Sequence, residues 1–323
     1  MQQLVKLVGI ARQAAEGSLL LEKRKVEYRS LPTRKWLNRC DSRRVPFTWT
    51  LNPYRGCEYG CKYCYARFTH EFLEWSGLDA FETEIYAKDF AEAAFRQELR
   101  HLKPGQVLGL GTATDPYQPL ERKLKLTRRV LKAMSGVEGI SLFITTKSDL
   151  VARDADVLRA LNRRNEVRVT MTVTTMDGEL ARLTEPFAPG PELRMKAVSE
   201  LTKAEVSVGV IASPVLPLLT DSAESLEGVA RSAKAAGADQ FGANVLFLKP
   251  SAQRVFLPFL EAHFPQHLAR YRQSYSSEAY LRGSYPDEIR KRVDRIRGQV
   301  GIERRNLERT SPPPLPGSQM LLF

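Results

Sequence analysis

The chain has 323 residues, 43% of them hydrophobic, and its 49 Lys and Arg against 37 Asp and Glu give a net charge of +12. That apolar content can bury one large core or two modest ones, which excludes disorder for most of the length. No run of about 18 apolar residues occurs, and Lys6, Arg12 and Glu16 interrupt the N-terminus. We therefore expect a soluble cytoplasmic protein with no membrane span and no secretion signal.

The positive charge is confined to the two ends of the chain. Residues 1–45 hold 11 basic and 4 acidic side chains, and residues 263–323 hold 11 and 6, whereas residues 46–262 hold 27 of each. A neutral core with basic flanks is typical of a catalytic domain that contacts a polyanion such as nucleic acid. The alternative is that the basic ends only increase solubility.

From residue 47 onward, apolar runs rich in β-branched residues alternate with helical patterns. We expect strands at 47–51, 106–111, 140–145, 167–173, 206–212 and 241–248. We expect helices at 89–102, 126–134, 153–164, 191–204 and 222–236. This alternation predicts a parallel sheet with right-handed crossovers.

Six such units are too few for a standard eight-stranded barrel, and no strand is followed by a G-x-G-x-x-G fingerprint. The fold class is therefore α/β, as a partial (β/α)6 TIM-like barrel with basic N- and C-terminal extensions. We divide the chain into a basic N-terminal extension (1–45), a core (46–262), a basic helical segment that carries several tyrosines (263–302) and a flexible Pro-rich tail (303–323).

Each expected strand ends in polar or special residues. These endings are Asn52-Pro53, Thr112 to Asp115, Thr146-Lys147, Thr174-Thr175, Ser213-Pro214 and Lys249-Pro250. In parallel α/β proteins ligands bind at the carboxyl edge of the strands, so the endings would face one shared cleft. Ordinary loop starts and helix caps are the alternative interpretation.

Three of the four cysteines lie close together as Cys57-x3-Cys61-x2-Cys64, just after the first strand. This spacing is unlike a disulfide framework and indicates a metal site in a reducing compartment. A zinc site would need His70 or Cys40 as its fourth ligand. A 4Fe-4S cluster would be held at three irons, which leaves the fourth iron open to a substrate or cofactor.

The C-x3-C-x2-C spacing with Tyr63 before the last cysteine resembles the signature of the radical S-adenosylmethionine (radical SAM) superfamily. Four longer strings resemble the branch that contains spore photoproduct lyase and its uncharacterised relatives. They are NPYRGCEYGCKYCYAR (52–67), GTATDPYQPLE (111–121), ITTKS (144–148) and EPFAPGPELRMKAVSEL (185–201). The resemblance covers about residues 45–262 and implies a 4Fe-4S cluster on Cys57, Cys61 and Cys64.

The resemblance also implies where SAM binds. By match to the family pattern, the cofactor-binding residues are Tyr63, Thr114, Asp115, Lys147, Thr174 and Arg194. Tyr63 would pack near the adenine, Thr114 and Asp115 would meet the amino group, and Thr174 would lie near the ribose. Lys147 and Arg194 would pair with the carboxylate. Without the resemblance, Thr114 or Asp115 would only cap the next helix, and Lys147 would be a solvated strand end. Arg194 would lie on a helix surface.

The tyrosines on both sides of Cys64, Tyr63 and Tyr65, match the lyase, and Tyr65 is the candidate catalytic residue; packing is their alternative role. The lyase has a cysteine as hydrogen donor where this chain has Thr112. A hydroxyl O–H bond is much harder to cleave homolytically than a thiol S–H bond. We therefore do not expect the identical thymine-dimer reaction, and Cys40 would be either a substitute donor or inert packing.

The last five residues, QMLLF, resemble the Q-L-x-L-F peptides by which bacterial DNA enzymes bind the replication sliding clamp. Gln319 would bind at the rim of the clamp groove, and Leu322 and Phe323 would fill an apolar pocket. The Pro-rich stretch before them would supply reach.

The favoured function is a radical SAM enzyme that acts on DNA or another nucleic acid, with an electron donor such as flavodoxin or ferredoxin. One alternative is a radical SAM enzyme that modifies a peptide or small molecule. The other is a non-enzymatic iron-sulfur or zinc protein.

Overall fold

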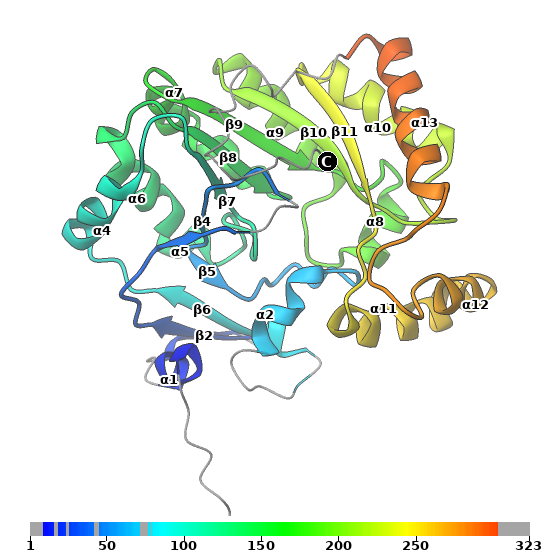
Figure 1. Ribbon diagram of the computed structural model, residues 1–323, viewed down its shortest axis with the longest axis horizontal. Helices are drawn as coiled ribbons and strands as arrows, with labels where there is room; N and C mark the ends of the chain where they lie inside the picture. The colour runs from blue at the N-terminus through cyan, green and yellow to red at the C-terminus, as the bar shows by residue number, and fades with distance from the viewer. Residues whose placement is uncertain are drawn as a thin grey trace, which may run out of the picture.

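The structure is a computed structural model that describes residues 9–15, 19–23, 26–41, 45–71, 77 and 79–302 (Figure 1). The expected tail at 303–323, with Gln319, Leu322 and Phe323, lies outside the described residues. In the described part of the chain, no helix is both long enough and apolar enough to span a bilayer.

The larger sheet described here has seven strands in the order β11-β10-β9-β8-β7-β4-β3. The strands are β3 (Leu37–Arg39), β4 (Trp49–Leu51), β7 (Val107–Leu110), β8 (Ser141–Thr146), β9 (Glu166–Thr172), β10 (Ser207–Val215) and β11 (Gln240–Val245). All neighbours from β4 to β11 are parallel, and β3 adds an antiparallel edge. The partial (β/α)6 barrel is thereby confirmed, with each strand where the sequence predicts it.

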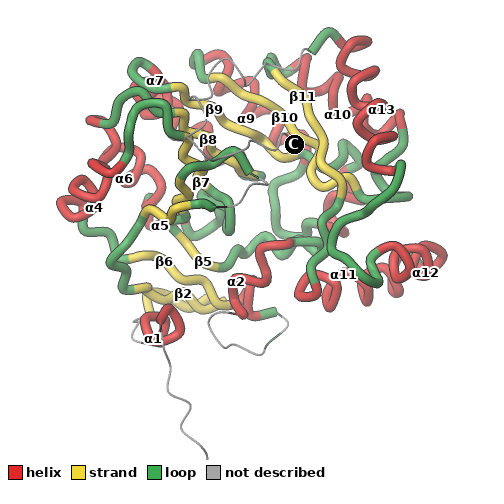
Figure 2. The backbone as a smooth tube through the Cα atoms, viewed as in Figure 1, coloured by secondary structure: helices red, strands yellow, loops and turns green. Residues whose placement is uncertain are grey.

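Helices cover the outer face of this curved sheet, as Figure 2 shows. They are α4 (Glu92–Glu98), α6 (Leu126–Ala133), α7 (Ala155–Asn162), α9 (Pro191–Lys203) and α10 (Ala223–Ala235). Helix α10 illustrates the local cause: the hydroxyl of Ser222 accepts a hydrogen bond from the Ser225 amide, and Leu226 and Val229 face the core at helical spacing. Strand β9 buries Val167 and Val169 completely beneath such helices.

A second sheet of four strands lies beside the barrel, in the order β1-β2-β6-β5. Its strands are β1 (Leu19–Lys23), β2 (Val26–Leu31), β5 (Tyr54–Arg55) and β6 (Glu84–Lys88). Strand β2, from the predicted N-terminal extension, pairs in parallel with β6 of the predicted core, and β6 pairs with β5. The sequence analysis did not anticipate this sheet, which holds the chain immediately before the first cysteine.

The remaining helices include three in the C-terminal region. These are α11 (Pro250–His263), α12 (Pro265–Ser274) and α13 (Tyr285–Val300). The shorter helices are α1 (Gly9–Ala15), α2 (Phe68–Glu71), α3 (Ala80–Thr83), α5 (Glu121–Leu124) and α8 (Gly178–Thr184). Helix α13 buries Ile289 and Val293 in the main core, and its Tyr285 hydroxyl donates to Asp221 at 2.7 Å. The basic C-terminal segment is therefore packed onto the barrel.

Replacing Leu142 by alanine tests the core. Leu142 is 1% exposed on β8, so Leu142→Ala should lower the free energy of unfolding by about 2–5 kcal/mol. Leu193→Ala, at a site 50% exposed on α9, should change it by about 0.5 kcal/mol or less. Urea unfolding measures both, and equal effects would contradict this placement of the core.

Candidate active site

The carboxyl ends of neighbouring strands meet at one edge of the barrel. The Asp115 carboxylate, after β7, accepts hydrogen bonds from the Thr146 hydroxyl and the Lys147 amide, both at 2.7 Å, at the end of β8. The Thr174 hydroxyl, after β9, lies 3.3 Å from the Ser213 carbonyl in β10. These contacts join four of the six predicted strand endings in two neighbouring pairs, and the shared cleft stays a prediction.

The cysteine loop begins with a turn that only glycine can make. Gly56 has φ of +76°, and a Cβ atom there would lie 2.8 Å from the carbonyl oxygen of Glu84. The Gly56 carbonyl accepts from the Thr114 hydroxyl at 2.5 Å and from the Gln118 amide group at 3.1 Å. The Cys57 amide donates to the Phe81 carbonyl at 2.9 Å. The loop is therefore held from several sides by the protein itself.

Two charged residues inside the cysteine string also hold the loop, and the sequence analysis missed their roles. Arg67 forms a bidentate ion pair with Glu82, at 2.6 and 2.9 Å, and donates to the Cys61 carbonyl at 3.1 Å. The buried Glu58 carboxylate accepts from the Tyr28 hydroxyl at 2.6 Å and from the Leu120 amide at 3.1 Å. The same string also contains Arg55 and Lys62, so charge alone does not show which of its residues are buried and need a partner.

The three thiols lie in apolar surroundings. Cys57 and Cys61 are buried in a cluster with Tyr63 and Phe81, and Cys64 packs against it. Burial raises the pKa of all three thiols, while the positive charge of Lys147 acts in the opposite direction on Cys61 and Cys64. Metals bind thiolates, so cluster assembly here would release protons.

The donor set fits a cubane better than a single ion. Zinc needs four ligand atoms within about 2.0–2.3 Å of one point, and among the described residues no group of three or more His, Cys, Asp or Glu is arranged to hold one ion. The His70 ring bonds the Glu84 carbonyl at 3.0 Å, and burial lowers its pKa to about 4. Cys40 lies beside Thr48, before β4, whereas the cysteine loop follows the other end of that strand.

Neither candidate fourth ligand is therefore placed to close a zinc site. Three thiolates would instead bind three separate irons of a cubane.

Beneath the cysteine loop lies a buried polar group centred on Glu185. One Glu185 oxygen accepts hydrogen bonds from the Tyr63 and Thr174 hydroxyls, which lie 3.0 Å from each other. The other oxygen pairs with Arg194. Burial by itself raises the pKa of Glu185, but the charges of Arg194 and Lys147 and these hydrogen bonds lower it to about 2. The carboxylate is therefore ionised at neutral pH.

Arg194 and Lys147, the two residues expected to pair with the SAM carboxylate, have different surroundings. Arg194 is 1% exposed rather than on a helix surface, and besides Glu185 it donates to the Pro189 carbonyl at 2.7 Å and the Thr172 carbonyl at 3.0 Å. Its guanidinium is thus bound within the protein and supports Tyr63 and Thr174 through Glu185. The Lys147 ammonium lies 5.7 Å from the Tyr63 ring centre, and no carboxylate in the described chain is within ion-pair distance of it.

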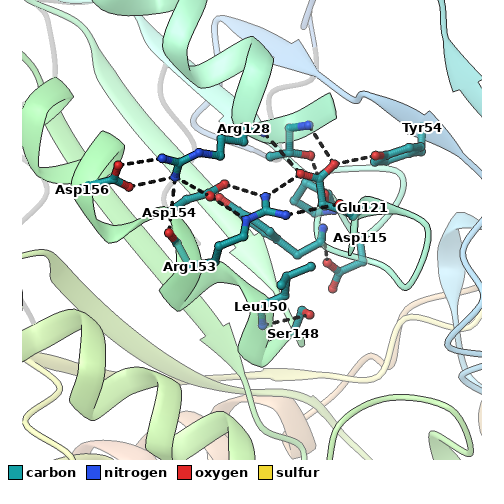
Figure 3. Close-up of polar contacts among 12 residues, drawn as sticks. Tyr54, Asp115, Glu121, Arg128, Ser148, Leu150, Arg153, Asp154 and Asp156 are labelled. Atoms are coloured by element: carbon teal, nitrogen blue, oxygen red, sulfur yellow. Dashed lines mark hydrogen bonds and ion pairs between the residues drawn. The ribbon is translucent and has the colours of Figure 1, made fainter. Parts of the chain in front are cut away.

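A second buried charged group positions the loops that follow β7 and β8 (Figure 3). The Glu121 carboxylate is fully buried and accepts from the Tyr54 hydroxyl at 2.5 Å and from Arg153 at 2.6 Å. Asp154, also fully buried, pairs with Arg153 at 2.8 Å and with Arg128 at 2.9 Å. Glu121 is the last residue of the string 111–121, but Tyr54 and Arg153 lie more than 30 residues away from it, so no local pattern predicted this network.

Tyr65 lies at the open side of the site. Its hydroxyl donates to the Thr112 carbonyl, and the residue is 43% exposed. The Thr112 hydroxyl accepts from the side-chain amide of Asn52 at 3.0 Å. The structure thus brings Tyr65 beside the position where the lyase branch has its hydrogen donor, and its catalytic role stays a prediction.

The site and fold define a class of protein. The family model of the radical SAM superfamily matches residues 51–231, and this chain belongs to that superfamily. Membership implies SAM and an iron-sulfur cluster. An uncharacterized protein of Mycobacterium tuberculosis is 35% identical over 252 residues, 77% of this chain and 73% of that protein. An uncharacterized protein of Methanocaldococcus jannaschii is 30% identical over 218 residues, 68% of this chain and 77% of that protein.

Solved structures show the same fold. A spore photoproduct lyase variant has a TM-score of 0.63 at 17% identity, and another, with bound AdoMet and dinucleoside spore photoproduct, has 0.59 at 14%; both matches cover 84% of this chain and 79% of the lyase. Streptococcus suis SuiB bound to precursor peptide SuiA has a TM-score of 0.51 at 12% identity, over 80% of this chain and 48% of SuiB. At these identities the similarity shows the fold alone.

Replacing Glu185 by glutamine should lower the free energy of unfolding at pH 7 by about 3 kcal/mol, because it leaves Arg194 buried with a neutral partner. The pKa of Glu185 is about 2 in the folded protein, below its usual 4.5. Its contribution is therefore complete above about pH 4.5 and is lost as the pH falls towards 2.

Urea unfolding between pH 7 and pH 3 measures this difference, which should shrink as the pH falls. Glu200→Gln, at a half-exposed site on helix α9, which carries Arg194, is the control and should have little effect. A difference that stays constant down to pH 3 would contradict the assigned pKa shift.

Proposed function

We propose that this protein is a radical SAM enzyme that holds a 4Fe-4S cluster on Cys57, Cys61 and Cys64. The observation that carries the proposal is a loop that presents three thiols, two of them buried, at the carboxyl edge of a parallel sheet, with neither His70 nor Cys40 placed as a fourth ligand. When bound and reduced, the cluster would supply the one electron that breaks the S–C5′ bond of SAM, giving methionine and a 5′-deoxyadenosyl radical.

The surrounding residues would bind and orient SAM. We assign Lys147 to its carboxylate, because the ammonium lies beside Tyr63 and its positive charge reaches two of the thiols. Tyr63 would contact the adenine and Thr174 the ribose. Arg194 would act through Glu185, as a positioning residue, rather than on SAM directly.

Thr114 and Asp115 would meet the SAM amino group at the carboxyl end of β7. Their side chains already bond the Gly56 carbonyl and the Lys147 amide. These two residues therefore also link the cysteine loop to the strand end that carries Lys147, whatever their contact with SAM. Tyr65 remains the candidate for a catalytic role, next to Thr112.

Replacing any one of the three cysteines by alanine should remove most of the bound iron and abolish SAM cleavage. Two thiolates can bind only two of the four irons, which is too few to hold the cluster. Cys40→Ala is the matched control and should keep both properties. Iron content after anaerobic reconstitution and 5′-deoxyadenosine formation with dithionite are the measurements. Turnover retained in a Cys57, Cys61 or Cys64 variant would refute the proposal.

Lys147→Met should raise the KM for SAM at least about tenfold, since one charge-assisted contact is worth about 1.5–3 kcal/mol. The iron content should not change, because Lys147 is not a ligand. Lys196→Met, which removes an exposed lysine on α9, should leave the KM as it is. An unchanged KM in Lys147→Met would exclude its carboxylate role.

We infer that the substrate is DNA or another nucleic acid and that the enzyme works in repair or modification. The excess of positive charge in the flanks supports this inference. Thr112, where the lyase branch has its donor cysteine, argues against the same thymine-dimer reaction. The redox compartment indicated by the cysteines favours the cytoplasm, with flavodoxin or ferredoxin as electron donor.

A peptide substrate is the second candidate, and the observation that favours it is the shared fold with SuiB bound to its precursor peptide. The proposed clamp contact through Gln319, Leu322 and Phe323 rests on sequence alone.

Salt dependence separates these substrate classes. If phosphates are bound, the affinity for a fluorescein-labelled 20-base-pair DNA should fall roughly 10-fold or more between 50 and 200 mM salt, because binding releases counterions. Fluorescence anisotropy of the anaerobically reconstituted protein measures the affinity. Affinity that is independent of salt, or no binding at 50 mM, would argue for the peptide or small-molecule class.

A further inference from the structure

A row of aromatic rings begins beside the third cysteine and leads away from it. The Tyr65 ring centre lies 6.3 Å from that of Phe247, which follows β11. Phe247 in turn is stacked on Tyr280, with ring centres 4.1 Å apart and ring planes inclined by 21°. The row therefore joins the cysteine loop, the end of the last barrel strand and the C-terminal segment.

Backbone pairing holds Phe247 and Tyr280 beside each other. Phe247 and Tyr280 form an antiparallel β-bridge, and the Leu248 amide donates to the Ala279 carbonyl at 2.9 Å. Beneath them, the buried Tyr275 donates its hydroxyl to the Leu246 carbonyl at 3.0 Å. This connection between α12 and α13 is thus tied to the end of β11, and the two rings are held in place.

Exposure distinguishes this row from ordinary aromatic packing. Tyr271 and Tyr275, on the same segment, are almost fully buried and bond backbone carbonyls, as structural tyrosines do. Tyr280 is 39% exposed, although its ring is already stacked on Phe247. A fixed, partly exposed ring next to a proposed radical site is a surface on which another flat ring can stack.

The positively charged Lys249 lies beside the same row of rings. The Lys249 ammonium lies 3.4 Å from the Phe68 ring centre and 5.8 Å from that of Phe247. No carboxylate in the described part of the chain is within ion-pair distance of Lys249. A flat uncharged ring beside an anionic group matches a nucleobase with its phosphate, and it matches a peptide side chain poorly.

We propose that Phe247 and Tyr280 form a stacking platform for a nucleobase of a single-stranded or flipped-out nucleotide, with Lys249 near its phosphate. The inference rests on the proposed function, since it names a subsite of that substrate beside the cysteine loop. Stacking accepts any base, so the platform would position the strand, and selectivity would come from elsewhere in the site.

The test compares binding of two fluorescein-labelled 12-mers by the anaerobically reconstituted full-length protein: single-stranded DNA, and the same backbone without bases. Tyr280→Ala should weaken binding of the normal 12-mer about tenfold, the effect typical of one lost base–aromatic stack. Tyr280→Phe, which keeps the ring, should bind like the wild type. The abasic 12-mer should bind all three proteins equally, because it has no ring to stack.

Several results would overturn the platform. They are equal binding of the normal 12-mer by wild type and Tyr280→Ala, an equal loss for both 12-mers, and no binding of either by the wild type. Far-UV circular dichroism and iron content show whether Tyr280→Ala folds, and Tyr280→Leu is the second ring-free variant.

SAM cleavage by the wild-type protein is scored separately. If the wild type cleaves SAM but the ring at 280 has no effect, the platform fails and the radical SAM proposal stands. If removing the ring at 280 weakens binding of the normal 12-mer but the wild type does not cleave SAM, the platform stands and the radical SAM proposal fails.

Discussion

The site depends on one constraint: the cysteine loop must direct its three sulfurs to one place without regular secondary structure, and its buried peptide groups still need hydrogen-bond partners. Neighbouring elements supply them. Thr114 and Gln118 bond the Gly56 carbonyl, the Phe81 carbonyl accepts from Cys57, and Arg67 bonds the Cys61 carbonyl. The loop is therefore an extension of the barrel edge and the second sheet, and the residues that hold it are as much part of the site as the thiols.

Burial of charge follows the same logic. Glu185 and Glu121 are both buried, and each is paired with an arginine and bonded to a tyrosine hydroxyl. A buried carboxylate without such partners would take up a proton, so the ion pairs keep these groups charged and fix the tyrosines. Such pairs add little to the net free energy of unfolding. Their main effect is to hold the loops at the carboxyl edge in a single arrangement. The balanced charge of residues 46–262 agrees with this use.

The predicted flanks are paired with segments of the predicted core. Residues that were predicted to be extensions pair with the predicted core: β2 pairs with β6 in the second sheet, and the segment around Tyr280 pairs with the chain after β11. The segment around Tyr280 in the C-terminal flank thus lies close to the cysteine loop, and the flank also adds positive charge. A nucleic acid that is drawn to this charge would meet the partly exposed ring of Tyr280 there.

The sequence by itself determined the parallel α/β architecture and the cysteine motif, because hydrophobic periodicity and short-range spacing are local properties of the chain. The strand endings that carry Asp115, Lys147 and Thr174 followed from that architecture. Only the tertiary structure decided that Arg194 is buried against Glu185, that Glu121 pairs with Arg153, and that Phe247 stacks on Tyr280. Except for Arg194 with Glu185, these partners are more than 30 residues apart, and even that pair depends on how α9 packs beneath the cysteine loop. The choice of partner for a buried charge or ring depends on packing across elements, which no local pattern records.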